Sequence, residues 1–262
     1  MFNNTLYVTK GSGGNGIDTV FQVGATGSLD SLTTNSTTTP ITILPGLPTA
    51  LASGTPTNYP FGIWFANANT LFVADEGAGG KFDASGNIAV ANGSVNTAAA
   101  ADGQAGLEEW NLGSNGVWTE THVWQAGLNL GVAYSVSGTS IGSTDQNGTA
   151  GTYSAASDGL RELTGQVNAD GTVTLYATTS TISNSGDQGA DPNKLVAITI
   201  GANTTGNESF TTLQTASYGE VLRGVSLAPT AAVSAVPLPP SLLMMLSGLG
   251  ITGLFARRNK RA

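Results

Sequence analysis

Cysteine is absent from this chain of 262 residues, and histidine occurs once, at His122. Without cysteine there are no disulfides, thiolate metal sites or cysteine nucleophiles, so stability has to come from packing and backbone pairing. A single imidazole leaves little for a histidine-rich metal site or a Ser-His-Asp triad, and His122 is best interpreted as a stacked or exposed strand residue. We therefore predict a protein that is not an enzyme, with no cofactor, no metal site and no catalytic residue.

Charged residues are also scarce, at 10% of the chain, and they are unevenly distributed. Four of the nine basic residues lie in the last six positions, and all 17 acidic residues lie upstream of them. Residues 1–236 hold five basic against 17 acidic residues and so carry a net charge of −12. A surface this acidic repels phosphate groups and anionic lipid headgroups, so we expect no nucleic-acid partner.

Glycine is abundant instead, with 36 residues, and apolar residues make up 40% of the chain. Many Gly, Thr, Ser and Asn residues with few charges are typical of short strands joined by turns rather than of long surface helices. The apolar content is sufficient for a substantial core. The composition therefore predicts an all-β protein.

Two hairpins are visible in the first half of the chain. The segment FGIWFANANTLFVADEG at 61–77 has alternating apolar residues on either side of a turn at 67–70. GLEEWNLGSNGVWTETHVW at 106–124 follows, with its turn at 113–116. We expect these four strands to form one antiparallel sheet.

A similar unit recurs downstream, with LTGQVNADGTVTLYATTS at 163–180, KLVAITI at 194–200 and SFTTLQTA at 209–216. Partial equivalents occur at 6–10, 18–24 and 41–46, and VLRGVSLAP at 221–229 reads as a further first strand. Repeated four-stranded antiparallel sheets resemble the blades of a β-propeller, in particular propellers with Leu-Tyr-Val-Ala-Asp strands, which here correspond to TLFVADEG. The resemblance covers most of residues 1–229 without a family-defining motif, and a β-sandwich is the alternative fold.

The propeller resemblance also raises an alternative function, a secreted hydrolase of the lactonase type. Asp75 and Glu76 follow the strand TLFVA, where some propeller enzymes place metal-binding carboxylates, and Glu108 and Glu109 lie in the next strand. The other repeats carry no carboxylates at corresponding positions, which favours solvated acids at strand ends. The tryptophans are open to two interpretations, stacking on sugar rings or packing between sheets; they are Trp64, Trp110, Trp118 and Trp124.

The chain ends in three elements in a fixed order, VPLPPSLLMMLSGLGITGLFARRNKRA from Val236 onward. The prolines within 237–240 exclude a helix and force an extended stretch. Ser241 can then cap an uncharged helix to Ala256, whose sixteen residues at about 1.5 Å each span about 24 Å. This is slightly short of a hydrocarbon core of about 30 Å, so flanking side chains must snorkel or the bilayer must thin.

The basic cluster behind the apolar run acts as the membrane stop in this interpretation. By the positive-inside rule it holds the C-terminus in the cytoplasm and places residues 1–236 outside. The cluster consists of Arg257, Arg258, Lys260 and Arg261.

This order of elements resembles the PEP-CTERM sorting signal of exported bacterial proteins. In that family a motif that is typically Val-Pro-Glu-Pro is recognised by exosortase, a membrane-embedded enzyme resembling a cysteine transpeptidase, which removes the helix and passes the protein to the surface. Here Val236, Pro237 and Pro239 match the motif, and Leu238 stands in place of the Glu. The resemblance covers only about the last 27 residues.

The resemblance implies an exported surface or extracellular-matrix protein, membrane-anchored until it is processed. Its expected partners are an exosortase, the lipid bilayer and exopolysaccharide, and the extracytoplasmic part has a structural or ligand-binding role. A permanent C-terminal anchor and an apolar helix buried in the domain are the alternatives. A buried helix would not need a basic cluster directly behind it.

We expect three regions along the chain: a propeller-like extracytoplasmic region at 1–229, an Ala/Pro linker with the Val-Pro-Leu-Pro motif at 230–240, and a transmembrane helix with a basic cytoplasmic tail at 241–262. The opening MFNNTLYVTK has no charged segment followed by an apolar one, as a signal peptide would. It starts almost directly on a strand, so we expect a leader and first repeats upstream of Met1.

Overall fold

The computed structural model describes residues 1–11, 15–32, 39–51, 58–78, 96–137, 152–183, 192–201 and 204–228. Met1–Leu227 form one compact unit, and of the second unit, Ala228–Ala262, only Ala228 is described. The described part is all-β, with three antiparallel sheets of three, five and four strands, one of them curled into a half-barrel. The predicted fold class is confirmed at this level.

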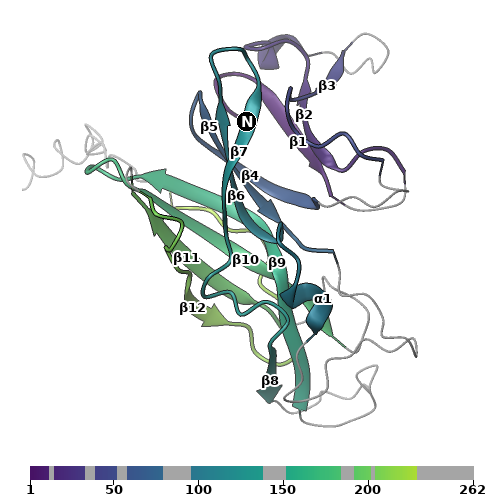
Figure 1. Ribbon diagram of the computed structural model, residues 1–262, viewed down its shortest axis with the longest axis vertical. Helices are drawn as coiled ribbons and strands as arrows, with labels where there is room; N and C mark the ends of the chain where they lie inside the picture. The colour runs from purple at the N-terminus through teal and green to yellow at the C-terminus, as the bar shows by residue number, and fades with distance from the viewer. Residues whose placement is uncertain are drawn as a thin grey trace, which may run out of the picture. The chain divides into compact units, whose positions relative to one another are not determined.

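All three sheets are meanders, in which each strand pairs with the next along the chain (Figure 1). The three-stranded sheet contains β1 (Leu6–Lys10), β2 (Thr19–Val23) and β3 (Ile41–Ile43). The four-stranded sheet contains β4 (Pro60–Asn67), β5 (Thr70–Asp75), β6 (Gly106–Leu112) and β7 (Trp118–Trp124). The five-stranded sheet contains β8 (Ala133–Ser137), β9 (Thr152–Val167), β10 (Val173–Ser183), β11 (Lys194–Ile200) and β12 (Thr211–Thr215).

The four-stranded sheet forms where the alternating pattern and the turns predict it. Ile63 pairs with Val73 and Phe65 with Leu71 across the β4–β5 turn. The β6–β7 turn closes through hydrogen bonds from Gly113 N to Val117 O and from Gly116 N to Gly113 O, both 2.9 Å. Gly116 has a φ of 77°, a left-handed conformation that favours glycine.

The five-stranded sheet differs from the prediction at its start. The hairpin turn at 168–171 is confirmed, with Gly171 N donating to Asn168 O at 3.0 Å. However, β9 begins at Thr152 rather than at 163, and β8 precedes it as a fifth strand. The residues TYSAASDGL at the start of β9 are mostly small or polar and show no apolar alternation, so no strand is predicted there.

The predicted strand at 221–229 is wrong over the described residues 221–228, which have no regular secondary structure. One of these residues, Leu222, is held by the side chain of Asn193 instead. Asn193, which is buried, donates from Nδ2 to Thr179 O and Leu222 O at 3.0 Å, and its Oδ1 accepts from Leu222 N at 2.7 Å. A pattern that looks like a strand does not form one when its backbone groups bond to an amide side chain.

The hydrogen bonds of the Asn193 side chain predict a local effect of mutating this residue. In Asn193→Ala the backbone groups of Leu222 and Thr179 lose their partners, which costs about 2–3 kcal/mol of unfolding free energy. We expect limited proteolysis to cut near Leu222 in the variant before the rest of the domain is attacked. Asn207→Ala, at an exposed amide that bonds only to Thr205 at 3.2 Å among the described residues, is the control and should digest like the wild type.

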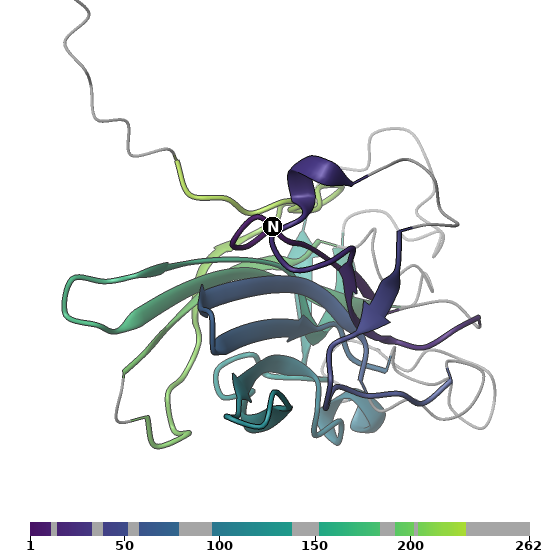
Figure 2. The ribbon, with the colours of Figure 1, turned by 90° about the horizontal axis from the view of Figure 1, so that it is seen from above.

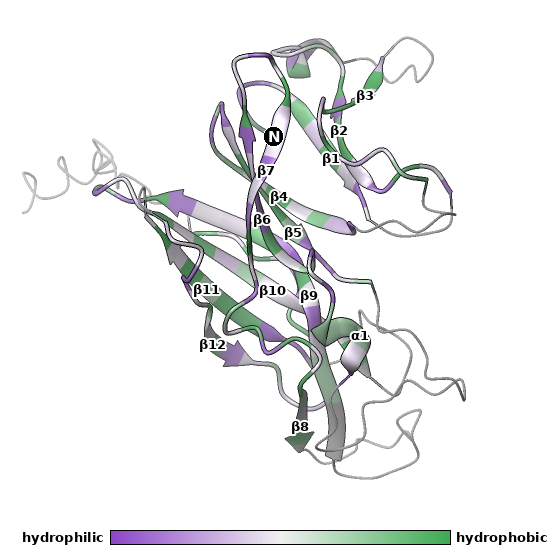
Figure 3. Ribbon diagram, in the orientation of Figure 1, coloured by the Kyte–Doolittle hydropathy of each residue, from purple (hydrophilic) through white to green (hydrophobic). Residues whose placement is uncertain are grey.

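The four-stranded sheet lies between the other two and is buried on both faces. Along β5, Leu71 and Val73 pack toward the three-stranded sheet, and Phe72 and Ala74 pack toward the five-stranded sheet. Successive strand residues point to opposite faces, so a continuous apolar run is what a doubly covered strand requires. Apolar stretches, in green, recur on strands of all three sheets in Figure 3.

One extra residue moves β7 from one core to the other. Glu109 pairs with His122 and Trp110 with Glu120, so Thr121 is left over as a β-bulge. As a result Trp118 packs with the three-stranded sheet, whereas Trp124 packs with the five-stranded sheet. In a regular strand these two side chains would point to the same face, because an even number of positions separates them. With the bulge both are buried, each in a different core.

Strands β1, β4 and β9, one from each of the three sheets, are neighbours. Strand β4 contacts β1 on one side and β9 on the other, and Figures 1 and 2 both show β4 and β5 against β9 and β10. The approach is close because glycines line it. A Cβ on Gly62 would lie 2.8 Å from Leu163 N, and one on Gly159 would lie 2.7 Å from the carbonyl carbon of Glu76.

Helix is limited, among the described residues, to the four-residue α1 (Thr97–Ala100) and the 3-10 turn Leu29–Ser31. Asn96 caps α1 through its Oδ1, which accepts from Ala98 N and Ala99 N at 3.1 and 3.0 Å. Within the described ranges, no helix has the length and apolar character needed to cross a bilayer. The predicted transmembrane segment at 241–256 lies outside those ranges.

Candidate functional site

The residues predicted for sorting and for the membrane stop lie outside the part of the chain that the structure describes. They are Val236, Pro237, Leu238 and Pro239 in the motif, and Arg257, Arg258, Lys260 and Arg261 in the basic cluster. Their assignment stays a prediction. Within the described residues, two other places bring chemically useful groups together: a pocket lined by aromatic residues and a group of buried carboxylates.

The aromatic pocket lies between the three-stranded and four-stranded sheets and has a volume of about 280 Å³. Its lining comes from five strands and the loops between them. The lining residues are Phe2, Asn3, Thr5, Tyr7, Gln22, Thr26, Leu44, Pro45, Phe65, Ala68, Leu112, Gly116 and Trp118. None of these side chains carries a charge at neutral pH, so the pocket is suited to a neutral ligand.

Aromatic rings form one wall of the pocket around Phe65. The Phe2 ring stacks on it with centroids 4.8 Å apart and planes 13° apart, and Tyr7 lies 4.7 Å away at a tilt of 43°. Trp118 meets Phe65 edge-on at 6.0 Å. These offset and edge-to-face arrangements are the favourable ones for aromatic pairs, so the wall is held by its own packing.

The rim of the pocket is held by hydrogen bonds. Asn3 and Asn4 both have positive φ, 45° and 54°, as a tight two-residue turn requires, and this turn folds Phe2 back to pair with Thr5. Thr5 Oγ1 accepts from Gly27 N at 2.8 Å, and Asn4 Nδ2 donates to Gly27 O at 3.0 Å. The turn and the loop that carries Thr26 are therefore fixed to each other.

The buried carboxylates lie where β5 and β6 meet β9. Asp75 and Asp158 are 0% exposed, and Glu108 is 2% exposed. In the β5–β6 ladder Asp75 pairs with Gly106 and Val73 with Glu108, so Asp75 and Glu108 are diagonal neighbours on one face. The interpretation of these strand-end acids as solvated is wrong for Asp75, Glu76 and Glu108, which are buried. The segment before β4 covers Asp75 and Glu108 through Tyr59 and Asn58.

Hydrogen bonds reach both carboxylates of this pair. Asp75 accepts from the backbone N–H of Tyr59 and, at 2.8 Å, from that of Gly77. Glu108 accepts from Asn58 Nδ2 at 2.6 Å and from Trp110 Nε1 at 2.7 Å. A cavity of about 10 Å³ beside Glu108 is large enough for one water molecule at most.

Burial raises the pKa of both groups. The pKa of Glu108 rises to about 7 because burial penalises its charged form, although the bonds from Trp110 and Asn58 oppose the shift. Burial raises the pKa of Asp75 well above its ordinary value, and the neighbouring Glu108 raises it further. The two groups titrate as a pair, and the neutral form is favoured at mildly acidic pH.

Glu76 has a different partner. Its Oε2 accepts from Arg161 Nε at 2.9 Å and Nη2 at 2.8 Å, and Arg161 also lies 4.9 Å from the centre of the Phe61 ring. Burial still raises the pKa of Glu76, with Arg161 acting in the opposite direction. The ion pair joins the end of β5 to β9.

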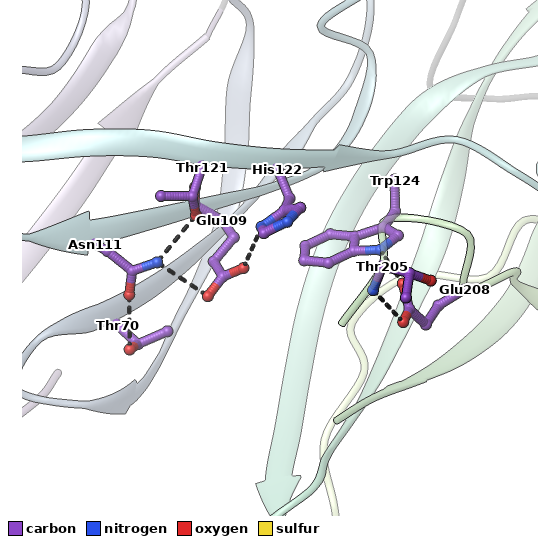
Figure 4. Close-up of polar contacts among 8 residues, drawn as sticks. All are labelled: Thr70, Glu109, Asn111, Thr121, His122, Trp124, Thr205 and Glu208. Carbon is purple, nitrogen blue, oxygen red and sulfur yellow. Dashed lines mark hydrogen bonds and ion pairs between the residues drawn. The ribbon is translucent and has the colours of Figure 1, made fainter. Parts of the chain in front are cut away.

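A row of polar contacts crosses the other face of the four-stranded sheet (Figure 4). His122 Nδ1 lies 3.0 Å from Glu109 Oε2, and the His122 ring stacks on Trp124 with centroids 5.1 Å apart. Trp124 Nε1 in turn donates to Glu208 Oε2 at 3.0 Å, which lowers the pKa of Glu208 to about 2. His122 is thus a stacked strand residue, as expected, and the row connects β7 to the segment before β12.

The tryptophans are packing residues. Trp110, Trp118 and Trp124 are buried, and Trp64 packs against the core between the four-stranded and five-stranded sheets. Trp118 also contributes to the aromatic pocket. In the described part of the chain, no group of three or more His, Asp or Glu residues is arranged to hold a metal ion.

Sequence reasoning missed the aromatic pocket because its lining is drawn from segments up to 116 residues apart, Phe2 to Trp118. Comparisons with protein-family models, curated proteins and solved structures gave no match to this chain.

Proposed function

We propose that this chain is an exported bacterial surface or extracellular-matrix protein whose last 27 residues are a PEP-CTERM-type sorting signal. The observation that carries the proposal is the order of elements in the tail: an extended proline motif, an uncharged apolar stretch and a basic end. Exosortase is the proposed processing enzyme and the bilayer the proposed site of processing. The protein is membrane-anchored before cleavage and lies at the cell surface or in the matrix afterwards.

The prolines have a physical role in this proposal. An extended segment with few accessible conformations loses little entropy when a membrane protease binds it. Pro237 and Pro239 restrict the backbone on both sides of Leu238, and each also removes a backbone donor. Leu238 stands where the family usually has Glu, so recognition in this chain relies on the prolines rather than on a carboxylate.

The described domain supports a surface role in two ways. It owes its stability to sheets and buried side chains, with no cysteine in the whole sequence. Asn193 also fixes the backbone of Leu222 to the domain, a short distance before the Ala/Pro linker at 230–240. The chain is therefore attached to the domain just upstream of the segment that this proposal assigns to processing.

We also propose that the sheets are propeller-like blades, one of them formed by β9–β12. Strands β1, β4 and β9 are consecutive neighbours, as the inner strands of adjacent blades are, with β8 as an additional strand beside β9, and the middle sheet is covered on both faces. A β-sandwich also stacks sheets face to face, so the succession of β1, β4 and β9 is the feature that favours the propeller.

Processing is tested by intact-mass measurement of the mature protein from a host with an exosortase and from the same host without one. We expect the chain to lose its tail near Pro237–Pro240 only when the exosortase is present. Pro237→Ala with Pro239→Ala should slow the loss at least about ten-fold, because the segment regains conformational freedom. Pro229→Ala, outside the motif, is the matched control and should be processed normally.

A reporter fused to Ala262 tests the orientation separately. We expect it to face the cytoplasm, and replacing the four basic residues by Gln should weaken that preference. A full-length mature chain with a cytoplasmic reporter would indicate a permanent anchor instead of a sorting signal. A reporter on the outer side would overturn both.

A further inference from the structure

We infer that the aromatic pocket binds one neutral sugar ring, presented by an uncharged extracellular polysaccharide. The ring would lie with a C–H face against the wall of Phe2, Tyr7 and Phe65 and with its hydroxyl groups toward the polar rim. This inference rests on the proposed function, because only an exported domain meets an extracellular polysaccharide.

The chemistry of the lining selects an amphipathic ligand. A purely apolar molecule would leave the amide groups of Asn3 and Gln22 at the rim without new partners, and a purely polar one would gain nothing from the aromatic wall. A sugar ring presents both kinds of surface, since its C–H groups are apolar and its hydroxyls donate and accept hydrogen bonds.

The rim has hydrogen-bonding capacity left for a ligand. Gln22 Nε2 donates to Gly24 O at 3.0 Å and to Thr26 Oγ1 at 3.3 Å, and these bonds orient the amide so that Oε1 remains available as an acceptor. Asn3 is exposed, and its side-chain amide has no hydrogen bond to another residue in the described ranges. A site that hydrogen-bonds hydroxyls discriminates strongly against analogues that lack them.

Charge argues against acidic sugars. Among the residues that the structure describes, no Asp, Glu, Lys, Arg or His lines the pocket, and residues 1–236 carry a net charge of −12. A uronic acid or a sulfated sugar would bring its negative charge to an acidic protein without a cation to receive it. A neutral sugar meets no such penalty.

Size and rigidity fit a single ring. At about 280 Å³ the pocket is near the lower limit of small-molecule sites, so it takes one ring while the rest of the polymer continues into solvent. The Asn3–Asn4 turn holds Phe2 on Phe65 before any ligand arrives. Preorganisation of this kind reduces the entropy lost on binding.

The test is saturation-transfer difference NMR on the full chain, held in lipid nanodiscs so that no detergent competes for the pocket. The probes are methyl β-glucopyranoside, methyl β-galactopyranoside, methyl α-mannopyranoside, methyl glucuronide and cyclohexanol. We expect a signal, strongest on the C–H protons of one ring face, from at least one neutral sugar and not from the glucuronide or cyclohexanol.

Phe2→Ala removes one ring of the wall at the start of the chain and should weaken binding about ten-fold, in line with the energy of aromatic stacking. Phe61→Ala is the matched control, since Phe61 is exposed on β4 but does not line the pocket, and it should bind like the wild type. Glycoside signals that both variants retain, signals only from cyclohexanol or the glucuronide, or no signal at all would each overturn the inference.

The proposed sorting signal and the inferred sugar site can be refuted independently of each other. The binding test uses the uncleaved chain and involves no exosortase, so absent binding leaves the sorting signal unaffected. A tail that is never removed would likewise leave the binding result as measured.

Discussion

The wild-type protein should unfold less readily at pH 5 than at pH 8, by about 2–3 kcal/mol, because of the buried carboxylate Glu108. Its pKa is raised from 4.5 to about 7 in the folded state, and each pKa unit corresponds to about 1.4 kcal/mol. Asp75, whose pKa is raised as well, acts in the same direction. Most single domains contain carboxylates that are stabilised as anions and so behave in the opposite way.

The direction of this pH dependence follows from whether the folded or the unfolded state binds the Glu108 proton more tightly. Between pH 4.5 and about 7 the unfolded chain has released the Glu108 proton, whereas the folded chain still binds it. Folding then takes up protons, so the free energy of unfolding falls as the pH rises through this window. Below the window both states are protonated, and above it both are ionised.

The measurement is urea-induced unfolding at half-unit steps from pH 5 to pH 8. Glu108→Gln removes the titrating group, so its stability should change with pH by about 2–3 kcal/mol less than that of the wild type. Glu220→Gln, at an exposed residue, should keep the full slope. A wild type that is more stable at pH 8 than at pH 5 would show that Glu108 and Asp75 are solvated in solution.

Gly159→Ala should strongly destabilise the described domain. The new Cβ would lie 2.7 Å from the carbonyl carbon of Glu76 and closer still to the carbonyl oxygen of Asp75. Both are backbone atoms that cannot rotate away, so β9 has to separate from the end of β5. We expect a loss of about 3 kcal/mol or more in unfolding free energy, which for a marginally stable domain reaches the limit of folding.

Gly103→Ala is the matched control, because a Cβ there has no atom within 4 Å and its φ is not in the left-handed region. It should be neutral or slightly stabilising, by up to about 0.5 kcal/mol. Thermal unfolding of the two variants beside the wild type makes the comparison. If Gly159→Ala unfolds at the wild-type temperature, β9 does not pack on β5 as closely as described.

Strands could be predicted wherever one local rule was sufficient. In β4 and β5 the alternation of apolar residues and the short turn at 67–70 agree, and the structure confirms both. The first half of β9 has no such signal, since residues such as Ser157, Asp158 and Gly159 are not apolar although they are buried. Asp158 and Gly159 lie against Asp75–Gly77, which is distant in the sequence. Segment 221–228 shows the converse, an apolar pattern that forms no strand and in which the backbone of Leu222 bonds to the Asn193 side chain.

Functional sites could be predicted only where the residues that form them are adjacent in the sequence. The tail motif around Pro237–Pro239 is of this kind, and it remains a prediction. The aromatic pocket needs Phe2, Phe65 and Trp118 in one place, and nothing in a single sequence indicates which sheets face each other. Asp75 and Glu108 were recognised as carboxylates of interest, but their burial depends on the segment before β4, which is distant from both of them in the sequence.

The extra residue Thr121 makes β7 one residue longer than the stretch of β6 that it pairs with. Removing Thr121 would keep His122 opposite Glu109 and Trp124 opposite Leu107, and would join these pairs to Trp110–Glu120 in an uninterrupted ladder. Trp118 and Trp124 would then still point to opposite faces of the sheet, and only the contacts of Thr121 with Asn111 and Glu109 would be lost. Homologous chains that keep this architecture can therefore lack one residue at this point of β7.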